Sequence, residues 1–215
     1  MTVLYDNELS TGIQPYDTIP TPLGECRIYA IHSSFLDKLS GFDCGEEEQN
    51  EFIRRLAVGH YLAGINHTFL LTCNGDLAGF VSFSSYSYAF AEGFLSKVRE
   101  AVREEFSKRG LPHGFDISFK KLPVVLLGQL GIDKRYQGKG LGTSLMREFV
   151  IPYSLNYCAE NSCIGILVYT RSAKDFYRKL GFQLIYEDKS GGANYFYSLY
   201  KNVLEIRYDA FSSKP

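Results

Sequence analysis

The sequence contains no tryptophan, only two methionines and almost no net charge. Its 23 Lys and Arg residues nearly balance 24 Asp and Glu residues, which gives a formal net charge of −1. This balance argues against a protein that binds nucleic acid over its whole surface or attaches to a membrane through a polybasic segment. It does not exclude one local basic face.

Long apolar runs are also missing. Charged or turn-forming residues interrupt every apolar stretch before it reaches about 18 residues, the length that marks a membrane-spanning helix. The N-terminal segment, MTVLYDNELSTG, lacks the basic region followed by an apolar one that is typical of a secretory signal. We therefore expect a cytoplasmic protein with no membrane partner.

The cysteines and histidines show no pattern typical of a metal site. The chain has five dispersed cysteines with neither a C-x-x-C pair nor a Cys/His ligand spacing: Cys26, Cys44, Cys73, Cys158 and Cys163. An odd number of scattered cysteines is typical of buried thiols in a reducing compartment. We expect no disulfide and no bound metal.

The length of 215 residues and the hydrophobic content of 45% predict one sizeable domain with additions. Residues 1–25 are polar, and the closely spaced Pro15, Pro20 and Pro22 argue against a helix or a central strand, so we expect an N-terminal arm. The domain itself is expected over 26–200, with a helical insertion at about 87–121 and a C-terminal tail over 201–215.

Hydrophobic periodicity predicts alternating strands and helices. An Asn-Gly dipeptide at Asn74 and Gly75 lies between two β-rich runs and predicts a hairpin. Pro152 is expected to break or kink a helix that follows the glycine-rich segment. The expected strands are 26–31, 67–73, 77–86, 122–132, 164–169, 182–186 and 193–200, and the expected helices are 51–63, 94–109, 143–151, 155–161 and 172–180.

The most informative segment runs from Leu130 to Thr143, LGIDKRYQGKGLGT, between an apolar strand and a helix. Its alternate glycines allow a ligand to approach the backbone closely, and their N–H groups, with the helix N-terminus behind them, form a cradle for an anion. The pattern therefore favours a phosphate-bearing ligand. No Ser or Thr follows Gly-Lys as in a P-loop, and the spacing differs from the dinucleotide fingerprint.

Two motifs in this order resemble the GNAT N-acetyltransferase superfamily. The first is Arg135-x-x-Gly138-x-Gly140 after an apolar strand, and the second is AKDFYRKLGF over residues 173–182, after a short strand. The resemblance covers about Ile28 to Tyr200. It implies an α/β (α+β) GNAT fold, in which a mixed, mostly antiparallel sheet has splayed central strands and helices on both faces.

The resemblance also implies acetyl-CoA as the cofactor and assigns residues to it. The strand backbone around Leu130 and Ile132 would pair with the pantetheine arm, amides of the following turn would hold the pyrophosphate, and nearby cations would neutralise phosphate. The implied cofactor residues are Leu130, Gly131, Ile132, Lys134, Arg135, Gln137, Gly138, Lys139, Gly140, Leu141, Gly142 and Thr143.

The implied reaction is direct attack of a primary amine on the acetyl group, with departure of a thiolate that needs a proton. The resemblance makes Tyr177 the candidate general acid. The chain departs from many relatives at two positions: Gln129 stands where a proton-relaying Glu is common, and Thr170 stands where an Asn is common. Because Gln129 cannot act as a base, either the amine has a low pKa or water or another carboxylate accepts the proton.

A finer resemblance is to the bacterial GNAT toxins of type II toxin-antitoxin pairs. It rests on FDCG at 42–45, on Phe52-Ile53, and on LGQLGIDKRYQGKGLG at 127–142. Those toxins acetylate the α-amino group of aminoacyl-tRNA, an amine of lowered pKa. Gln49 and the net charge of −1 argue against the match, and five basic groups between Lys120 and Lys139 argue weakly for an RNA partner. The candidate partners are aminoacyl-tRNA, an antitoxin protein and a second copy of the chain.

Alternatives stay open at the level of sequence. The acceptor is aminoacyl-tRNA, a small amine or a protein amino group. A further hypothesis is that the chain is a CoA-binding module without catalytic turnover. The insertion, from about Tyr86 to Lys121, is a candidate lid, dimer contact or acceptor platform. Its aromatic residues Tyr86, Tyr88, Phe90 and Phe94 suit either an acceptor wall or a buried core.

Overall fold

The computed structural model describes residues 13–111 and 121–212. The start of the expected arm, residues 112–120 of the expected insertion and the last three residues lie outside these ranges. The chain divides into two compact units. The first comprises the residues up to Ser84 together with Leu127–Pro152, and the second comprises Ser85–Leu126 and Tyr153–Pro215.

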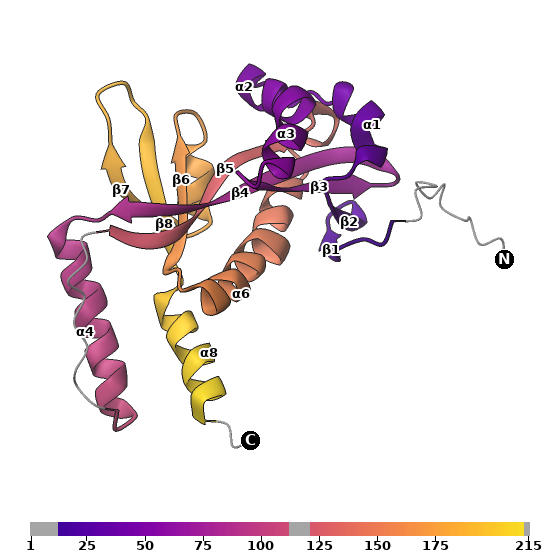
Figure 1. Ribbon diagram of the computed structural model, residues 1–215. Helices are drawn as coiled ribbons and strands as arrows, with labels where there is room; N and C mark the ends of the chain where they lie inside the picture. Colours follow the sequence, from indigo (N-terminus) through magenta and orange to yellow (C-terminus); the bar gives the residue numbers. More distant parts are fainter. Residues whose placement is uncertain (1–12, 112–120, 213–215) are drawn as a thin grey trace. The chain divides into compact units, whose positions relative to one another are not determined.

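The described residues form a sheet of eight strands in the order β1-β2-β3-β4-β5-β6-β8-β7. The fold is therefore α+β with a mixed, mostly antiparallel sheet, as predicted (Figure 1). β4 and β5 contribute residues to both units. The strands are β1 (Asp17–Thr21), β2 (Gly24–Ala30), β3 (His67–Cys73), β4 (Asp76–Ala89), β5 (Lys121–Ile132), β6 (Gly165–Thr170), β7 (Gln183–Glu187) and β8 (Ala193–Ser198).

In the first unit, β1 to β4 pair as successive antiparallel neighbours. The predicted hairpin between β3 and β4 is confirmed, since Asn74 and Gly75 both have positive φ angles, of 52° and 80°. The helices are α1 (Leu36–Ser40), α2 (Glu47–Glu51) and α3 (Ala57–Leu62), with a π-helical turn over Phe52–Leu56 between the last two. Phe35, Phe42 and Phe80 are buried in the core of this unit.

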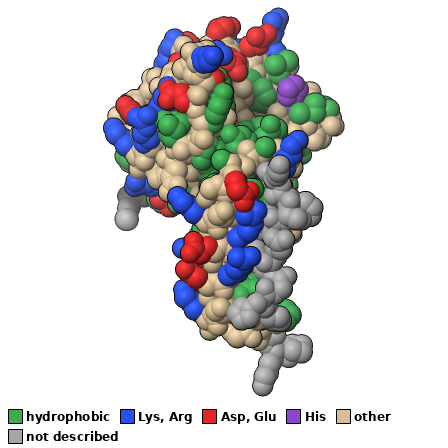
Figure 2. All heavy atoms as spheres, turned by 90° about the vertical axis from the view of Figure 1, so that its left-hand side faces the viewer, with side chains coloured by type: hydrophobic (Ala, Val, Ile, Leu, Met, Phe, Trp, Pro, Cys, Tyr) green, Lys and Arg blue, Asp and Glu red, His purple; other side chains and the backbone are tan. Residues whose placement is uncertain are grey.

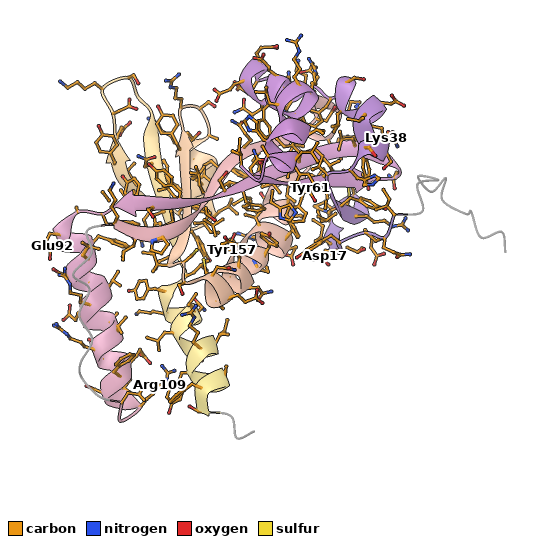
Figure 3. All side chains as sticks on the ribbon, in the orientation of Figure 1. Asp17, Lys38, Tyr61, Glu92, Arg109 and Tyr157 are labelled. Carbon is orange, nitrogen blue, oxygen red and sulfur yellow. A yellow bond between two sulfur atoms is a disulfide. The ribbon has the colours of Figure 1, made fainter. Side chains whose placement is uncertain are left out.

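The part of the expected N-terminal arm that the structure describes includes a strand. β1 begins at Asp17, labelled in Figure 3, and pairs along β2 at the edge of the sheet. Ile19 is only 1% exposed, so this short strand anchors itself through one buried side chain. An edge position tolerates Pro20, because the strand has no second neighbour that would need its missing N–H.

The helix after the glycine-rich segment continues through Pro152, so the predicted break is wrong. α5 (Leu141–Ser144) passes into a π-helical turn over Leu145–Val150 and then into α6 (Ile151–Asn161). Proline has no N–H and crowds the carbonyl of the preceding turn. The wider π-helical turn directly before Pro152 changes the hydrogen-bond spacing and so accommodates the ring without ending the helix.

The second unit contains α4 (Glu92–Lys108), α7 (Lys174–Lys179) and α8 (Tyr200–Ser212). Glu92 and Arg109, labelled in Figure 3, mark the two ends of α4. α4 and α8 are in contact, and their apolar residues join a cluster that includes Phe90, Leu167 and Phe196. On the solvent side of α4, basic and acidic side chains are interspersed (Figure 2), as in the Arg99–Glu92 pair at 2.6 Å.

The described part of the expected C-terminal tail over 201–215 belongs to the helix α8. Val203 is buried, and Leu204 packs against the same cluster as α4. Arg207 also ties α8 to the end of α6, because its Nε donates to the carbonyl of Ala159 at 2.7 Å. Packing of this apolar face stabilises the helix.

The expectation that the cysteines are all free thiols is also wrong. Cys26 and Cys73 form a disulfide between β2 and β3, whereas Cys44, Cys158 and Cys163 are free and buried. Cys26 and Cys73 are direct partners in the antiparallel register, with their Cα atoms 4.6 Å apart. That separation falls within the range that a disulfide spans, and a linear count of cysteines does not reveal it.

Candidate functional site

The glycine-rich segment of the first unit is organised around one buried carboxylate. β5 ends at Ile132, and Asp133, 2% exposed, caps the 3-10 turn Lys134–Tyr136. Its Oδ1 accepts hydrogen bonds from the backbone N of Arg135 at 3.0 Å and from the Arg135 Nε at 2.8 Å. Burial raises the pKa of Asp133, but these hydrogen bonds outweigh burial, so the net shift is downward. The carboxylate is ionised at neutral pH.

A second carboxylate ties the segment to the loop before α2. The backbone N of Lys134 donates to the Asp43 carbonyl at 2.8 Å, and Lys134 Nζ lies 2.9 Å from Asp43 Oδ2. The Asp43 backbone N in turn donates to Asp133 Oδ2 at 3.3 Å. Hydrogen bonds from the Lys134 side chain, the Gly45 backbone and Asn50 lower the pKa of Asp43 to about 2. The FDCG motif thus positions the turn.

The turn enters α5 through two glycines with left-handed backbone. Gly138 and Gly140 have φ angles of 71° and 80°, a conformation that costs other residues free energy. A Cβ on Gly140 would also lie 3.1 Å from the Pro22 side chain. The first helical hydrogen bond of α5 runs from Ser144 N to the Gly140 carbonyl. The amides of residues 141–143 precede that bond and lack helical partners, so the turn fits an anionic pyrophosphate.

The predicted cofactor residues are brought together in the first unit, but their side chains differ in availability. Lys134 is paired with Asp43, and Arg135 is paired with Asp133 and lies 3.8 Å from Asp76. Lys139 Nζ donates to the Arg135 carbonyl at 2.8 Å. The Gln137 side chain donates to the carbonyls of Cys44 and Ile132, at 2.7 and 2.8 Å. These side chains build the turn, and the backbone amides are left for a ligand.

The predicted pantetheine-pairing residues lie at the end of β5. Gly131 is buried, and a Cβ there would lie 2.6 Å from the Phe80 ring and 3.3 Å from the Phe42 ring. Leu130 and Ile132, on either side of Gly131, are partly buried. Gln129 precedes them, and its Oε1 is buried with no hydrogen-bond partner among the described residues. An unpaired buried acceptor is costly, so this oxygen is suited to a donor from a ligand.

Tyr177 lies in the second unit, on α7. It is 5% exposed and packs edge-on against Phe176 and Phe182, at centroid distances of 5.2 and 5.4 Å. Burial raises its pKa, so the hydroxyl keeps its proton across the physiological range. No hydrogen bond joins that hydroxyl to another described residue.

α7 begins next to a polar contact made by Thr170, the residue that stands where many relatives have an Asn. The Thr170 hydroxyl accepts a hydrogen bond from the backbone N of Ala173 at 3.0 Å, immediately before the helix. Thr170 therefore supplies a supporting bond at this end of β6. Arg178 lies on the same helix, with its guanidinium 5.9 Å from the centre of the Tyr195 ring.

Two functional features of this site were missed by sequence reasoning. Neither the burial of Asp133 nor its bonds to Arg135 was predicted, although an Asp directly before a short turn is a typical N-cap signal. The contact of Asp43 with Lys134 joins residues 91 positions apart, which no local pattern reveals. Over residues 13–111 and 121–212, no group of three or more His, Cys, Asp and Glu side chains is arranged to hold a metal ion. Nor is any helix there long and apolar enough to cross a membrane.

The family is shown by comparison with known proteins. The model for the acetyltransferase (GNAT) domain matches residues 64–184, which is more than half of the chain. The match includes the glycine-rich turn and α7. The chain therefore belongs to the GNAT acetyltransferases.

The chain is also similar to individual known proteins. A tRNA-acetylating toxin of Mycobacterium tuberculosis (strain ATCC 25618 / H37Rv) is 28% identical over 114 residues, which are 53% of this chain and 58% of that protein. The match thus spans less than two thirds of that relative's length.

Two solved structures share the fold. AtaT complexed with acetyl-methionyl-tRNAfMet aligns with a TM-score of 0.60 and 22% identity, over 84% of this chain and 99% of the other. A tyrosine-to-phenylalanine mutant of AtaT, bound to the C-terminus of the antitoxin AtaR and acetyl-CoA, aligns with a TM-score of 0.58 and 21% identity, over 84% and 97% of the two chains.

Proposed function

We propose that this GNAT acetyltransferase transfers the acetyl group of acetyl-CoA to the α-amino group of an aminoacyl-tRNA. The observation that carries the cofactor assignment is the left-handed turn at Gly138 and Gly140, which leads into the unpaired amides of α5. Support for the acceptor comes from the 28% identity to a tRNA-acetylating toxin.

The backbone amides of Gln137, Gly138, Gly140, Leu141 and Gly142, with the Thr143 hydroxyl, would hold the pyrophosphate. Lys134, Arg135 and Lys139 act mainly by shaping this turn, because each already has a partner within it or in the FDCG loop. The Leu130–Ile132 backbone would pair with the pantetheine arm. Acetyl-CoA, when bound, supplies the activated thioester.

Tyr177 would serve as the acid. Its raised pKa keeps the hydroxyl protonated, so it can donate to the negative charge that develops on sulfur as the thiolate departs. A free thiol has a pKa near 8.5, so complete transfer from a tyrosine of raised pKa is uphill. The favourable contribution is a hydrogen bond that strengthens in the transition state.

Gln129 would accept a hydrogen bond from the attacking amine through its unpaired Oε1. An amide orients the amine but does not remove a proton, so the acceptor must present its lone pair without a strong base. Amino groups next to a carbonyl have a pKa of about 8 in peptides, against about 10.4 for lysine. This difference favours an aminoacyl acceptor over a lysine side chain.

An antitoxin protein is a further proposed partner, supported by the likeness to AtaT bound to AtaR. A second copy of the chain is another candidate. Because tRNA and acetyl-CoA are both cytoplasmic, we place the protein in the cytoplasm.

The test is a thiol-release assay with acetyl-CoA and aminoacyl-tRNA, run on the wild type and Tyr177→Phe. We expect the wild type to release CoA only with the aminoacylated RNA, and the variant to lose roughly 10²–10⁴-fold in kcat with unchanged affinity for acetyl-CoA. Unchanged turnover in Tyr177→Phe would contradict the acid role. Stabilisation by acetyl-CoA without any turnover would indicate a CoA-binding module, and turnover with simple amines alone would reassign the acceptor.

A further inference from the structure

Exposed tyrosines in the second unit lie on one face of the sheet. Tyr86, Tyr169 and Tyr186 are 48%, 45% and 54% exposed, although tyrosines carry a large apolar ring. They come from three different strands, β4, β6 and β7. A cluster of exposed rings from separate strands marks an interaction site.

The strand register places two of these rings on either side of one residue. Asn194 on β8 is the direct partner of Tyr169 on β6 and of Tyr186 on β7. Direct partners in antiparallel strands project from the same face. An irregularity in the register between Leu184 and Tyr186 brings Tyr186 opposite Asn194. The three side chains therefore form a row across β6, β8 and β7.

The β4 tyrosines join the same face. Tyr88 packs against Phe90 at 4.9 Å, and Phe90 packs against Phe196 at 5.1 Å. Phe196 lies two residues from Asn194 on β8, so the two share a face. The Asn194 side chain also hydrogen-bonds the Tyr88 hydroxyl. Phe90 is thus core, whereas the tyrosines extend that core outward to solvent.

Polar contacts orient the Tyr169 ring, and two basic residues lie near it. The Tyr169 hydroxyl donates to Asp188 Oδ2 at 3.0 Å and accepts from the Arg171 Nε at 3.3 Å. Lys189 is exposed in the turn between β7 and β8. Lys174 on α7 lies 2.6 Å from Glu187. Glu187 alternates with Tyr186 on β7, so the Lys174–Glu187 pair lies on the opposite face of the sheet. Arg171 and Lys189 are the basic residues beside the aromatic face.

Rings held in place beside basic groups suit unpaired nucleobases better than a protein helix. Single-stranded nucleic acid is bound by stacking bases on aromatic side chains while cations contact the phosphates. The β6 end of this face also leads into α7, which carries the proposed acid. Tyr169 precedes Thr170, whose hydroxyl accepts a hydrogen bond from the backbone N of Ala173, directly before the helix.

We propose that Tyr86, Tyr88, Tyr169 and Tyr186 form a stacking platform for the unpaired bases at the 3′ end of the acceptor RNA. This proposal rests on the proposed function, because it names the part of the acceptor that the second unit holds. It assigns the recognition of RNA to aromatic stacking, with the cations in a supporting role.

The binding test uses a fluorescently labelled RNA oligonucleotide with an unpaired CCA end, without an amino acid. Tyr169→Ala and Tyr186→Ala should each weaken binding about tenfold, the range of one lost stacking contact. Tyr186→Phe should bind as the wild type, because it keeps the ring. Tyr61→Ala is the matched control, since Tyr61 is an exposed tyrosine on α3 in the first unit.

The kinetic test compares aminoacyl-tRNA with an amino acid methyl ester, which has no bases. The alanine variants should raise KM for the RNA substrate and leave kcat and the methyl ester reaction unchanged. RNA binding equal to the wild type in both alanine variants would overturn the proposal. Variants that lose binding to a protein partner but still bind the RNA would also overturn it. A wild type that binds the oligonucleotide but does not acetylate would overturn the proposed function and leave the platform standing.

Discussion

Asp133 and Arg135 form a two-point contact within one short turn, through the backbone N and the Nε of Arg135. The buried carboxylate at the end of β5 thereby fixes both the start of the turn and the direction of its guanidinium. The glycines that follow at Gly138 and Gly140 depend on this start for their position in the chain.

Asp133→Asn should therefore loosen the turn. Replacement removes a charged acceptor from Arg135 and from the Asp43 amide, and a lost buried hydrogen bond of this kind costs about 1–3 kcal/mol. We expect the free energy of unfolding in urea to fall by that amount and the affinity for acetyl-CoA to fall as well. Asp37→Asn, on the exposed first turn of α1, is the control and should change neither quantity. Equal effects in both variants would contradict the role of Asp133.

Asp43 makes an acid-sensitive contribution. Its pKa is lowered to about 2 in the folded chain, against 3.8 in its ordinary state. A depressed folded-state pKa stabilises the fold above the ordinary value, and this stabilisation is lost as the pH falls through 4 towards 2. We expect Asp43→Asn to reduce the slope of stability against pH in this window, measured by urea unfolding at each pH. The same slope in both proteins would argue against the Lys134 contact in solution.

Gly140→Ala should impair cofactor binding. The φ angle of 80° strains any residue with a Cβ, and the new methyl group would press on Pro22. A cost of about 1–2 kcal/mol is expected, with weaker binding of acetyl-CoA by calorimetry. Gly93→Ala on α4 is the matched control, because its Cβ would meet no atom within 4 Å and alanine favours helix. Normal acetyl-CoA binding by Gly140→Ala would exclude this turn as the cradle.

Gln129→Glu should widen the range of acceptors. A carboxylate at this position can take a proton from an ammonium group, which the native amide cannot. We expect acetylation of a lysine-like amine to rise at neutral pH and the pH–rate profile to shift to lower pH. Gln183→Glu, on exposed β7, should leave the profile unchanged. If both variants behave alike, Gln129 does not face the amine.

The Cys26–Cys73 bond should make stability sensitive to reductant. It closes a loop with a sequence separation of 47 residues, and loop-closure entropy for that length corresponds to about 4 kcal/mol. We expect a lower unfolding midpoint in dithiothreitol for the wild type. The double variant Cys26→Ser with Cys73→Ser should be insensitive to the reductant, and a wild type that is equally insensitive would contradict the prediction.

Local patterns in the sequence predict much of this fold. The Asn74-Gly75 hairpin, the strand before the glycines and the helix α4 each follow from a short run of residues. α8 could have been found in the same way, because Tyr200, Val203 and Leu204 recur at helical spacing. Local rules act on neighbours in sequence, so they succeed where neighbours determine the structure.

The remaining features depend on residues that meet only after folding. Asp43 meets Lys134 across 91 positions, and Cys26 meets Cys73 across 47. The continuation of the helix through Pro152 depends on the π-helical turn before it, and residue propensities do not predict such a turn. The cofactor residues were predicted by motif, whereas the pairing of their charges required the tertiary contacts.

Formation of the cross-strand disulfide can also report when β2 and β3 pair during folding. A slip of β2 by one residue along β3 would turn Cys26 to the opposite face of the sheet from Cys73, where the sulfurs could not join. Only chains that have already aligned the two strands correctly can be oxidised at this position. The loss of free thiol during refolding therefore times the moment at which β2 and β3 align.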